Sequence, residues 1–205
     1  MQHAMVETGR RDGDAPLTEL LQRAASGEAA AADEALPSVY RELRRLAEAR
    51  MAGERRNHTL QATALVHETW LRLAGVGDRA WPDRAAFYQA AAAAMRHILV
   101  DHARRRARQK RGGGGAREPI SVGALQAPEG GGVYDPATFL ELDEQIRALE
   151  RDDPRAGAVV RLRFFAGLGV DETAEALGLS RRTVLREWSF ARARLFAALH
   201  GDDLR

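Results

Sequence analysis

The sequence predicts an all-α fold, with two small helical domains joined by a flexible linker. Apolar residues recur at every third or fourth position along most of the 205 residues, which is the spacing of one helix face, and the alternation typical of strands is almost absent. Between positions 112 and 136 this pattern is interrupted by clustered glycine and proline. We therefore expect a loose tail at 1–16, a first domain at 17–110, a linker at 111–138 and a second domain at 139–200.

The first domain should be a helical bundle. Four helices are expected, one beginning at Leu17 and the others covering about 29–51, 61–74 and 84–109. Ser26 and Gly27 break the first helical pattern. Asp83 precedes the longest helix and can cap it, because a short acidic side chain accepts hydrogen bonds from the free N–H groups of a first turn.

The second domain should end in a helix–turn–helix. Helices are expected over about 137–150 and 154–166, and the stretch 167–184 reads as a short helix, a three-residue turn and the start of another helix. Gly178 can take the left-handed conformation of the turn, and Ser180 can cap the helix that follows. This arrangement can lay a helix in the DNA major groove. Taken alone, the same pattern also fits an ordinary helical hairpin with a solvated arginine face.

The distribution of charge indicates a polyanionic partner. The net charge is only +2, from 31 basic and 29 acidic residues. Between positions 96 and 111, however, seven cations stand against the single anion Asp101. A basic stripe on a nearly neutral chain is typical of contact with nucleic acid along one face.

Several classes of protein are excluded or disfavoured. The chain has no cysteine, which excludes disulfides, thiolate zinc sites and cysteine nucleophiles. His67-Glu68 lacks the second metalloprotease histidine, because position 71 is leucine, and no glycine-rich phosphate loop follows a strand. We expect no catalytic residue, no metal site, no cofactor and no enzyme activity. Without a signal pattern or a membrane-length apolar run, we expect a cytoplasmic protein that does not insert into membranes.

Several separated motifs resemble one family. Residues 42–46, 58–61, 63–72 and 98–105 resemble region 2 of extracytoplasmic-function sigma factors, and Asp153-Pro154, 160–165 and the helix–turn–helix resemble their region 4. The resemblance covers about 17–110 and 139–199, in the order of the family. It implies a subunit that directs bacterial core RNA polymerase to promoter DNA and helps to open the duplex. Whether an anti-sigma factor or a regulatory kinase controls it stays open.

The resemblance also implies three sets of contact residues. The set implied to bind polymerase is Leu65, Val66, Glu68, Trp70, Leu71 and Arg72. The set implied to read the minus-ten element is Arg79, Trp81, Phe87, Tyr88, Arg96, His97, Asp101, Arg104 and Arg105. The set implied to read the upstream, minus-thirty-five element is Arg181, Arg182, Thr183, Leu185, Arg186, Ser189 and Arg192. Leu185 departs from the family, whose members commonly carry lysine there. Glu187 could accept a bond from cytosine or tune repulsion.

Alternatives to these roles come from the residues themselves. Leu65, Trp70 and Phe87 also fit core positions, and Glu68 can pair with Arg72 one turn away. A conventional helix–turn–helix regulator with an amino-terminal sensor domain would dimerise and bind palindromic DNA unaided. The linker favours two tethered modules, because about 24 glycine-rich residues span roughly 27 Å on average and about 80 Å when extended. We expect the isolated chain to bind promoter duplex poorly.

Overall fold

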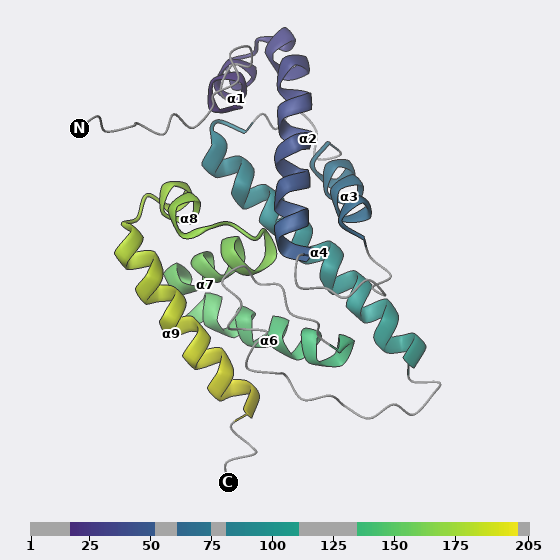
Figure 1. Cartoon of the computed structure of the whole chain (residues 1–205), viewed down its shortest axis with the longest axis vertical. Helices are drawn as coiled ribbons and strands as arrows, with labels where there is room; N and C mark the ends of the chain where they lie inside the picture. Colours follow the sequence, from purple (N-terminus) through teal and green to yellow (C-terminus); the bar gives the residue numbers. More distant parts are fainter. Residues whose placement is uncertain (1–16, 52–60, 75–80, 111–134, 201–205) are drawn as a thin grey trace, which may run out of the picture.

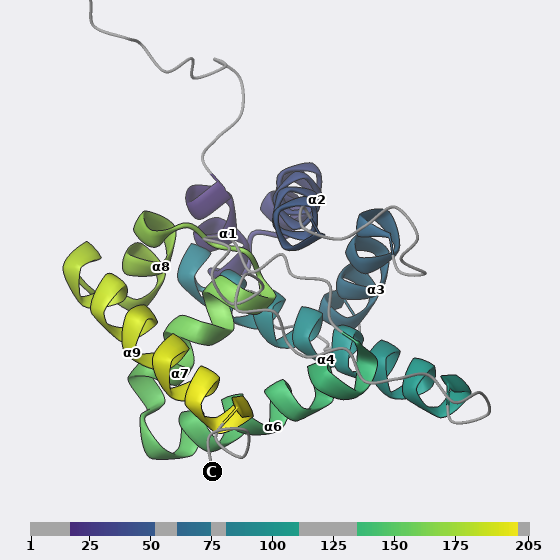
Figure 2. The ribbon, with the colours of Figure 1, turned by 60° about the horizontal axis from the view of Figure 1, so that its bottom comes forward.

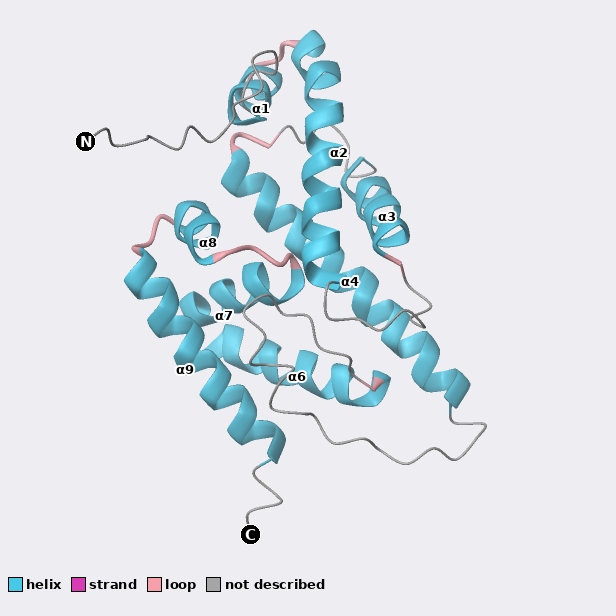
Figure 3. Ribbon diagram, in the orientation of Figure 1, coloured by secondary structure: helices cyan, strands magenta, loops and turns pink. Residues whose placement is uncertain are grey.

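The computed structural model describes residues 17–51, 61–74, 81–110 and 135–200, and these ranges are helical with short connections (Figures 1 and 3). The helices are α1 (Leu17–Ala25), α2 (Ala29–Met51), α3 (Ala62–Ala74), α4 (Arg84–Lys110), α6 (Pro136–Asp152), α7 (Pro154–Val160), α8 (Val170–Leu177) and α9 (Arg181–His200), and α7 continues into the π-helical turn η1 (Arg161–Phe165). No strand occurs within the described ranges. The all-α prediction is confirmed. We call residues 17–110 the first half and residues 135–200 the second half.

Three aspartates set helix boundaries by local hydrogen bonds. Asp83 Oδ1 accepts from the Ala86 N–H at 2.7 Å, at the start of α4. Asp153 ends α6 and begins α7, since its own N–H donates to the Leu149 carbonyl at 2.7 Å while its side chain accepts from the Ala156 N–H at 2.9 Å. Short acidic caps of this kind satisfy donors that have no partner inside the helix.

The third aspartate corrects the expected end of the linker. Asp135 caps α6 by accepting from the Ala137 N–H at 3.0 Å, and Pro136 occupies the first helical position. Proline suits this position because its fixed φ is already helical and no N–H is lost there. Residues 136–138, expected in the linker, therefore form the first turn of α6; residues 111–134 lie outside the described ranges.

The helix–turn–helix has the local features that the sequence predicts. Gly178 ends α8 with φ +62°, and the Leu179 N–H donates a hydrogen bond to the Ala174 carbonyl at 2.9 Å. Ser180 caps α9, with its Oγ accepting from the Thr183 N–H at 3.1 Å. The turn that joins the two helices is therefore fixed by its own residues.

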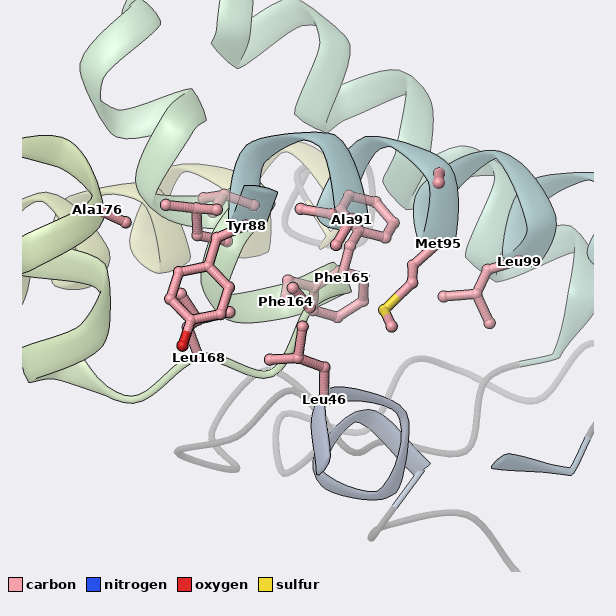
Figure 4. Close-up of a cluster of buried hydrophobic side chains, with 14 of the residues drawn as sticks. Leu46, Tyr88, Ala91, Met95, Leu99, Phe164, Phe165, Leu168 and Ala176 are labelled. Atoms are coloured by element: carbon pink, nitrogen blue, oxygen red, sulfur yellow. The ribbon is translucent and has the colours of Figure 1, made fainter. Parts of the chain in front are cut away.

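The tertiary arrangement differs from two independently packed domains. Helix α4 contacts α1 and α3 of the first half and also α6, η1 and α8 of the second half, so it lies between them (Figures 1 and 2). Figure 4 shows Leu46 of α2 and Met95 of α4 packed with Phe164 and Phe165 of η1. One hydrophobic cluster thus runs through both halves.

The sequence of α4 explains this shared core. Its buried residues lie on more than one side of the helix, including Ala91, Ala92, Ala94 and Ile98. A helix that is apolar over so much of its circumference must be covered from several directions. Small alanine side chains let neighbouring helices approach it closely. The residues of the second half supply the cover that the first half lacks.

Candidate nucleic-acid interface

The predicted upstream-reading residues all lie on α9, between Arg181 and Arg192. The exposed members of the set are Arg181, Arg182, Leu185, Arg186 and Ser189, and the half-buried members are Thr183 and Arg192. Residues three or four positions apart lie on one face of a helix. The structure therefore gathers this set along one helix, beginning at its capped first turn.

Two of the three arginines near the start of α9 form ion pairs with acidic side chains. Arg181 Nη1 lies 2.7 Å from both carboxylate oxygens of Asp171 in α8. Arg186 Nη2 donates to Glu187 Oε1 at 2.7 Å. Arg182 has no ion-pair partner among the described residues, so its guanidinium is the readiest to meet a new acceptor.

Buried side chains support α9 from below. Val184, Trp188, Ala191 and Leu195 are in the core, as their spacing predicts. The guanidinium carbon of Arg163 lies 4.9 Å from the Trp188 ring centroid, a cation–π distance. Glu187 is also buried, which corrects its expected place on the outward face: it supports Arg186 and is not itself presented to DNA.

The structure places some residues of the minus-ten set at the surface and others in the core. His97, Arg104 and Arg105 are exposed on α4, and Asp101 is half-buried near them. Trp81 is half-buried, with its ring edge against Phe87 at a centroid distance of 5.4 Å. Arg79 lies outside the described residues.

The remaining three members of the minus-ten set lie in the core, and their implied role in reading the element stays a prediction. Phe87, Tyr88 and Arg96 are buried, with Tyr88 2% and Arg96 8% exposed. In this arrangement none of the three is accessible to a nucleic acid. The sequence reading for Phe87 as a core aromatic is confirmed.

Tyr88 is a buried hydrogen-bond donor. Its hydroxyl donates to Glu42 of α2, and that carboxylate also accepts from Arg45 at 2.8 Å and from Arg84 at 3.4 Å. Burial, followed by the hydrogen bond to Glu42, raises the pKa of Tyr88, so the phenol stays protonated. For Glu42, burial opposes ionisation, but the bonds from Arg45 and Tyr88 and the nearby arginine charges outweigh it and lower its pKa.

All the described hydrogen bonds of the Arg96 side chain are made to residues of the second half. Its Nε donates to Asp143 Oδ1 at 2.7 Å, its Nη2 to the Asp143 carbonyl at 3.3 Å, and its Nη1 to Glu150 Oε2 at 2.7 Å. The Arg96 guanidinium carbon also lies 5.1 Å from the Phe165 ring centroid. These contacts satisfy a buried charge from three directions.

The predicted polymerase-binding set is divided between core and surface. Leu65 and Val66 are fully buried, as the core alternative for Leu65 predicts, and their implied role in binding polymerase stays a prediction. Leu71 is 69% exposed on α3, beside the exposed Arg72. Glu68 and Trp70 are half-buried.

Arg72 pairs with Asp101, not with Glu68, the pairing that the sequence spacing left open as an alternative. Its Nη2 donates to Asp101 Oδ2 of α4 at 2.9 Å, and no described contact joins it to Glu68. The exposed end of α3 is therefore linked to the basic end of α4, where Arg104 lies 3.8 Å from the same carboxylate.

Other kinds of site find no support in the described ranges. No group of three or more histidine and acidic side chains is placed there to hold a metal ion. None of the described helices is both long and apolar enough to cross a membrane.

Comparison with known proteins identifies one family. The model of a family described as ECF sigma factor matches residues 14–201, nearly the whole chain. Comparisons with curated proteins and with solved structures give no match.

Proposed function

The chain belongs to the family of ECF sigma factors, which start transcription at specific promoters with RNA polymerase, and we propose how its two halves divide that work. The first half, residues 17–110, binds core polymerase and the minus-ten element. The second half, whose helices begin at Pro136, binds the upstream element. The observation that carries the proposal is the exposed, capped arginine face of α9.

Recognition of the upstream element is proposed for α9. Arg182 and Arg186 lie one turn apart, are exposed, and stand near a helix start that Ser180 caps. An arginine that donates two bonds to guanine discriminates by about 1–3 kcal/mol. Leu185 is 44% exposed on the same helix and suits apolar contact with a thymine methyl group.

Melting of the minus-ten element is proposed for the exposed end of α4 together with Trp81. Opening a base step costs a few kcal/mol of free energy. Stacking of the bases on aromatic side chains, together with contacts to phosphates, must offset that cost. Arg104 and Arg105 supply phosphate-binding charge, and the half-buried indole of Trp81 supplies a stacking surface. His97 lies on the same helix and is exposed.

Docking on core polymerase is proposed for α3. Leu71 offers an apolar contact, with Arg72 as its charged neighbour. The pair Arg72–Asp101 would bring the polymerase contact and the melting residues to one side of the first half.

The test is run-off transcription with purified bacterial core polymerase and a promoter library. We expect specific starts that require the chain, and a loss of those starts with Arg182→Ala. Arg155→Ala, which removes an exposed arginine from α7 outside the reading face, is the matched control. No specific start, together with tight dimeric binding of the chain to a palindrome, would instead establish the regulator alternative.

A further inference from the structure

The three arginines nearest the start of α9 differ in how firmly they are held. Arg181 is paired with Asp171 of α8, and the two side chains are 64% and 74% exposed. Water and salt weaken an exposed pair of this kind, so it restrains the arginine little. Arg182 has no ion-pair partner within the described part of the chain. Arg186 is the one of the three that is bound to a buried carboxylate, that of Glu187.

Glu187 lies on the core side of α9. It is 7% exposed, and the buried Val184 and Ala191 lie three positions before it and four positions after it. Helix α9 packs against α6, α7 and α8 (Figure 1). A buried carboxylate has lost its hydration, which disfavours folding unless a partner of opposite charge compensates. Among the described residues, the ion pair of Glu187 is with Arg186, so its charge is balanced from the solvent side of the helix.

The bond between these two residues sets the direction of a long side chain. Arg186 Nη2 donates to Glu187 Oε1 at 2.7 Å, although adjacent residues of a helix do not face each other. The Arg186 side chain therefore bends along the surface of α9 toward the edge of the core, and it remains 69% exposed. A guanidinium presents its N–H donors in one rigid plane. One bond to a fixed carboxylate thus orients the donors that remain available.

A guanidinium that is oriented in advance suits a base better than a phosphate. Two N–H groups must meet two acceptors of guanine at once, so the contact depends on the plane of the guanidinium. A side chain that is ordered before binding also loses less conformational entropy when it binds. Attraction to phosphates depends instead on net positive charge, and the carboxylate of Glu187 offsets the charge of Arg186.

We propose that Glu187 is a positioning residue for base recognition by Arg186. Its carboxylate orders the guanidinium before DNA arrives and reduces the attraction of that guanidinium to phosphates. The proposal rests on the recognition of the upstream element by α9 proposed above. Arg182, one turn away and without such a partner, is free to contact either a base or a phosphate.

The proposal predicts two changes of opposite sign when Glu187 loses its charge. Sequence preference at the base pair read by Arg186 should fall, because the guanidinium is no longer ordered and can turn to a phosphate. Attraction to DNA of any sequence should rise, because one more cation is available to phosphates. A carboxylate that only supports the fold would behave differently, since its loss would weaken both.

The test is Glu187→Gln in the full chain bound to core polymerase. Competitive run-off transcription from promoters that differ at single upstream base pairs measures preference. We expect preference to fall about 2- to 12-fold at the base pair that Arg186→Ala also affects, the range that corresponds to ordering one long side chain. Binding of a promoter with a scrambled upstream element should become more salt-dependent, its logarithmic slope steeper by up to about 0.9.

Glu175→Gln is the matched control, because it removes one negative charge from an exposed position of α8 in the same helix–turn–helix. Preference and salt dependence equal to those of this control would overturn the positioning role of Glu187 and leave the proposed function intact. Unchanged upstream preference in Arg186→Ala would overturn both.

Glu187→Met keeps the test decisive where the buried amide of the glutamine variant destabilises the fold. Replacing a buried charge by an apolar side chain of similar size often leaves stability unchanged or raises it. We expect wild-type or higher stability in urea together with the same loss of preference. A stable Glu187→Met chain with wild-type preference would contradict the proposal.

A double-mutant cycle assigns the effect to the pair. In the Arg186→Ala background, Glu187→Met should leave the preference unaltered, because no guanidinium remains there to be ordered. A further loss of preference in the double variant would show that Glu187 acts through another residue, against the proposal.

Discussion

Arg96 and Asp143 stand 47 positions apart in the chain, yet Arg96 Nε donates to Asp143 Oδ1 at 2.7 Å with both side chains buried. The bond joins the longest helix of the first half to the first described helix of the second half. Arg147 meets the other oxygen of the same carboxylate, Oδ2, at 3.0 Å, but from an exposed position. One carboxylate thus has a buried and an exposed partner, which allows the two to be compared.

Arg96→Ala should lower the stability of the folded chain. Removing one member of a buried ion pair leaves the other uncompensated, at a cost of about 3–5 kcal/mol. Arg147→Ala should cost no more than about 1 kcal/mol, because the Arg147 side chain is largely solvated. Urea unfolding of the two variants measures both, and equal effects would contradict a special role for the buried partner.

Gly157→Ala should destabilise the packing of α7 on α6. A Cβ at this position would lie 2.7 Å from the Glu150 Cα, a backbone atom that cannot rotate away. Overpacking of this kind costs about 1–3 kcal/mol. Gly169→Ala is the control, since the nearest atom to its Cβ would be a Glu172 oxygen at 3.5 Å. Thermal unfolding should separate the two variants, and a more damaging Gly169→Ala would show that the close approach is not decisive.

Glu42 should make the chain acid-sensitive. Its pKa is below the ordinary 4.5 in the folded chain, so folding favours the ionised carboxylate. The resulting stabilisation is complete above about pH 4.5 and is lost as the pH falls through the lower folded value. The difference in unfolding free energy between the wild type and Glu42→Gln should therefore shrink between pH 7 and pH 3. A difference that stays constant with pH would exclude this carboxylate as the source.

Arg186→Ala should relax sequence preference at one upstream base pair. Loss of a two-bond contact to guanine corresponds to about 1–3 kcal/mol, or roughly 5- to 150-fold in discrimination. The measurement is competitive transcription from promoters that differ at single upstream positions. Ser189→Ala, which keeps the charge of the helix, should change overall affinity more evenly. Unchanged preference in both variants would refute the placement of the reading face.

Leu71→Asp should weaken binding to core polymerase without unfolding the chain. The side chain is 69% exposed, so its replacement disturbs little of the fold. Leu65→Ala, one and a half turns earlier and fully buried, should instead cost about 2–5 kcal/mol of stability. Binding to labelled core enzyme and urea unfolding distinguish the two effects, and normal core binding by Leu71→Asp would remove α3 from the proposed contact.

Local signals in the sequence predict the helices well. The caps at Asp83, Asp153 and Ser180 and the left-handed Gly178 all act within a few residues of their partners. Such features depend on chemistry that a short stretch of chain contains. The expected helix start at about 137 is one residue from Pro136, whereas the expected domain boundary at 139 is three residues late, because Asp135 and Pro136, a cap and a first-turn proline, were assigned to the glycine- and proline-rich linker.

The contacts between the two halves could not be predicted from local sequence signals. The contacts of Arg96 and Arg45 span 47 to 127 positions, and no local pattern specifies which carboxylate a distant arginine will meet. One usable signal was present. The run of alanines at 90–94 gives α4 apolar residues on more sides than the first half covers, which indicates a second packing partner. Glu187 lies three positions from the buried Val184 and four from the buried Ala191, so its spacing fits the core side of α9, but its charge favoured an outward position in the sequence.

Glu172 accepts hydrogen bonds from two residues, the distant Arg45 of α2 and the nearby Gly169. Gly169 is the residue just before α8, its N–H donates to Glu172, and Thr173 Oγ1 donates to the Gly169 carbonyl at 2.7 Å to hold the same turn. Departure of Arg45 therefore leaves the start of α8 intact and frees one oxygen to face solvent. On the proposed division of work, the helix–turn–helix would meet DNA already shaped, with no folding left to do there.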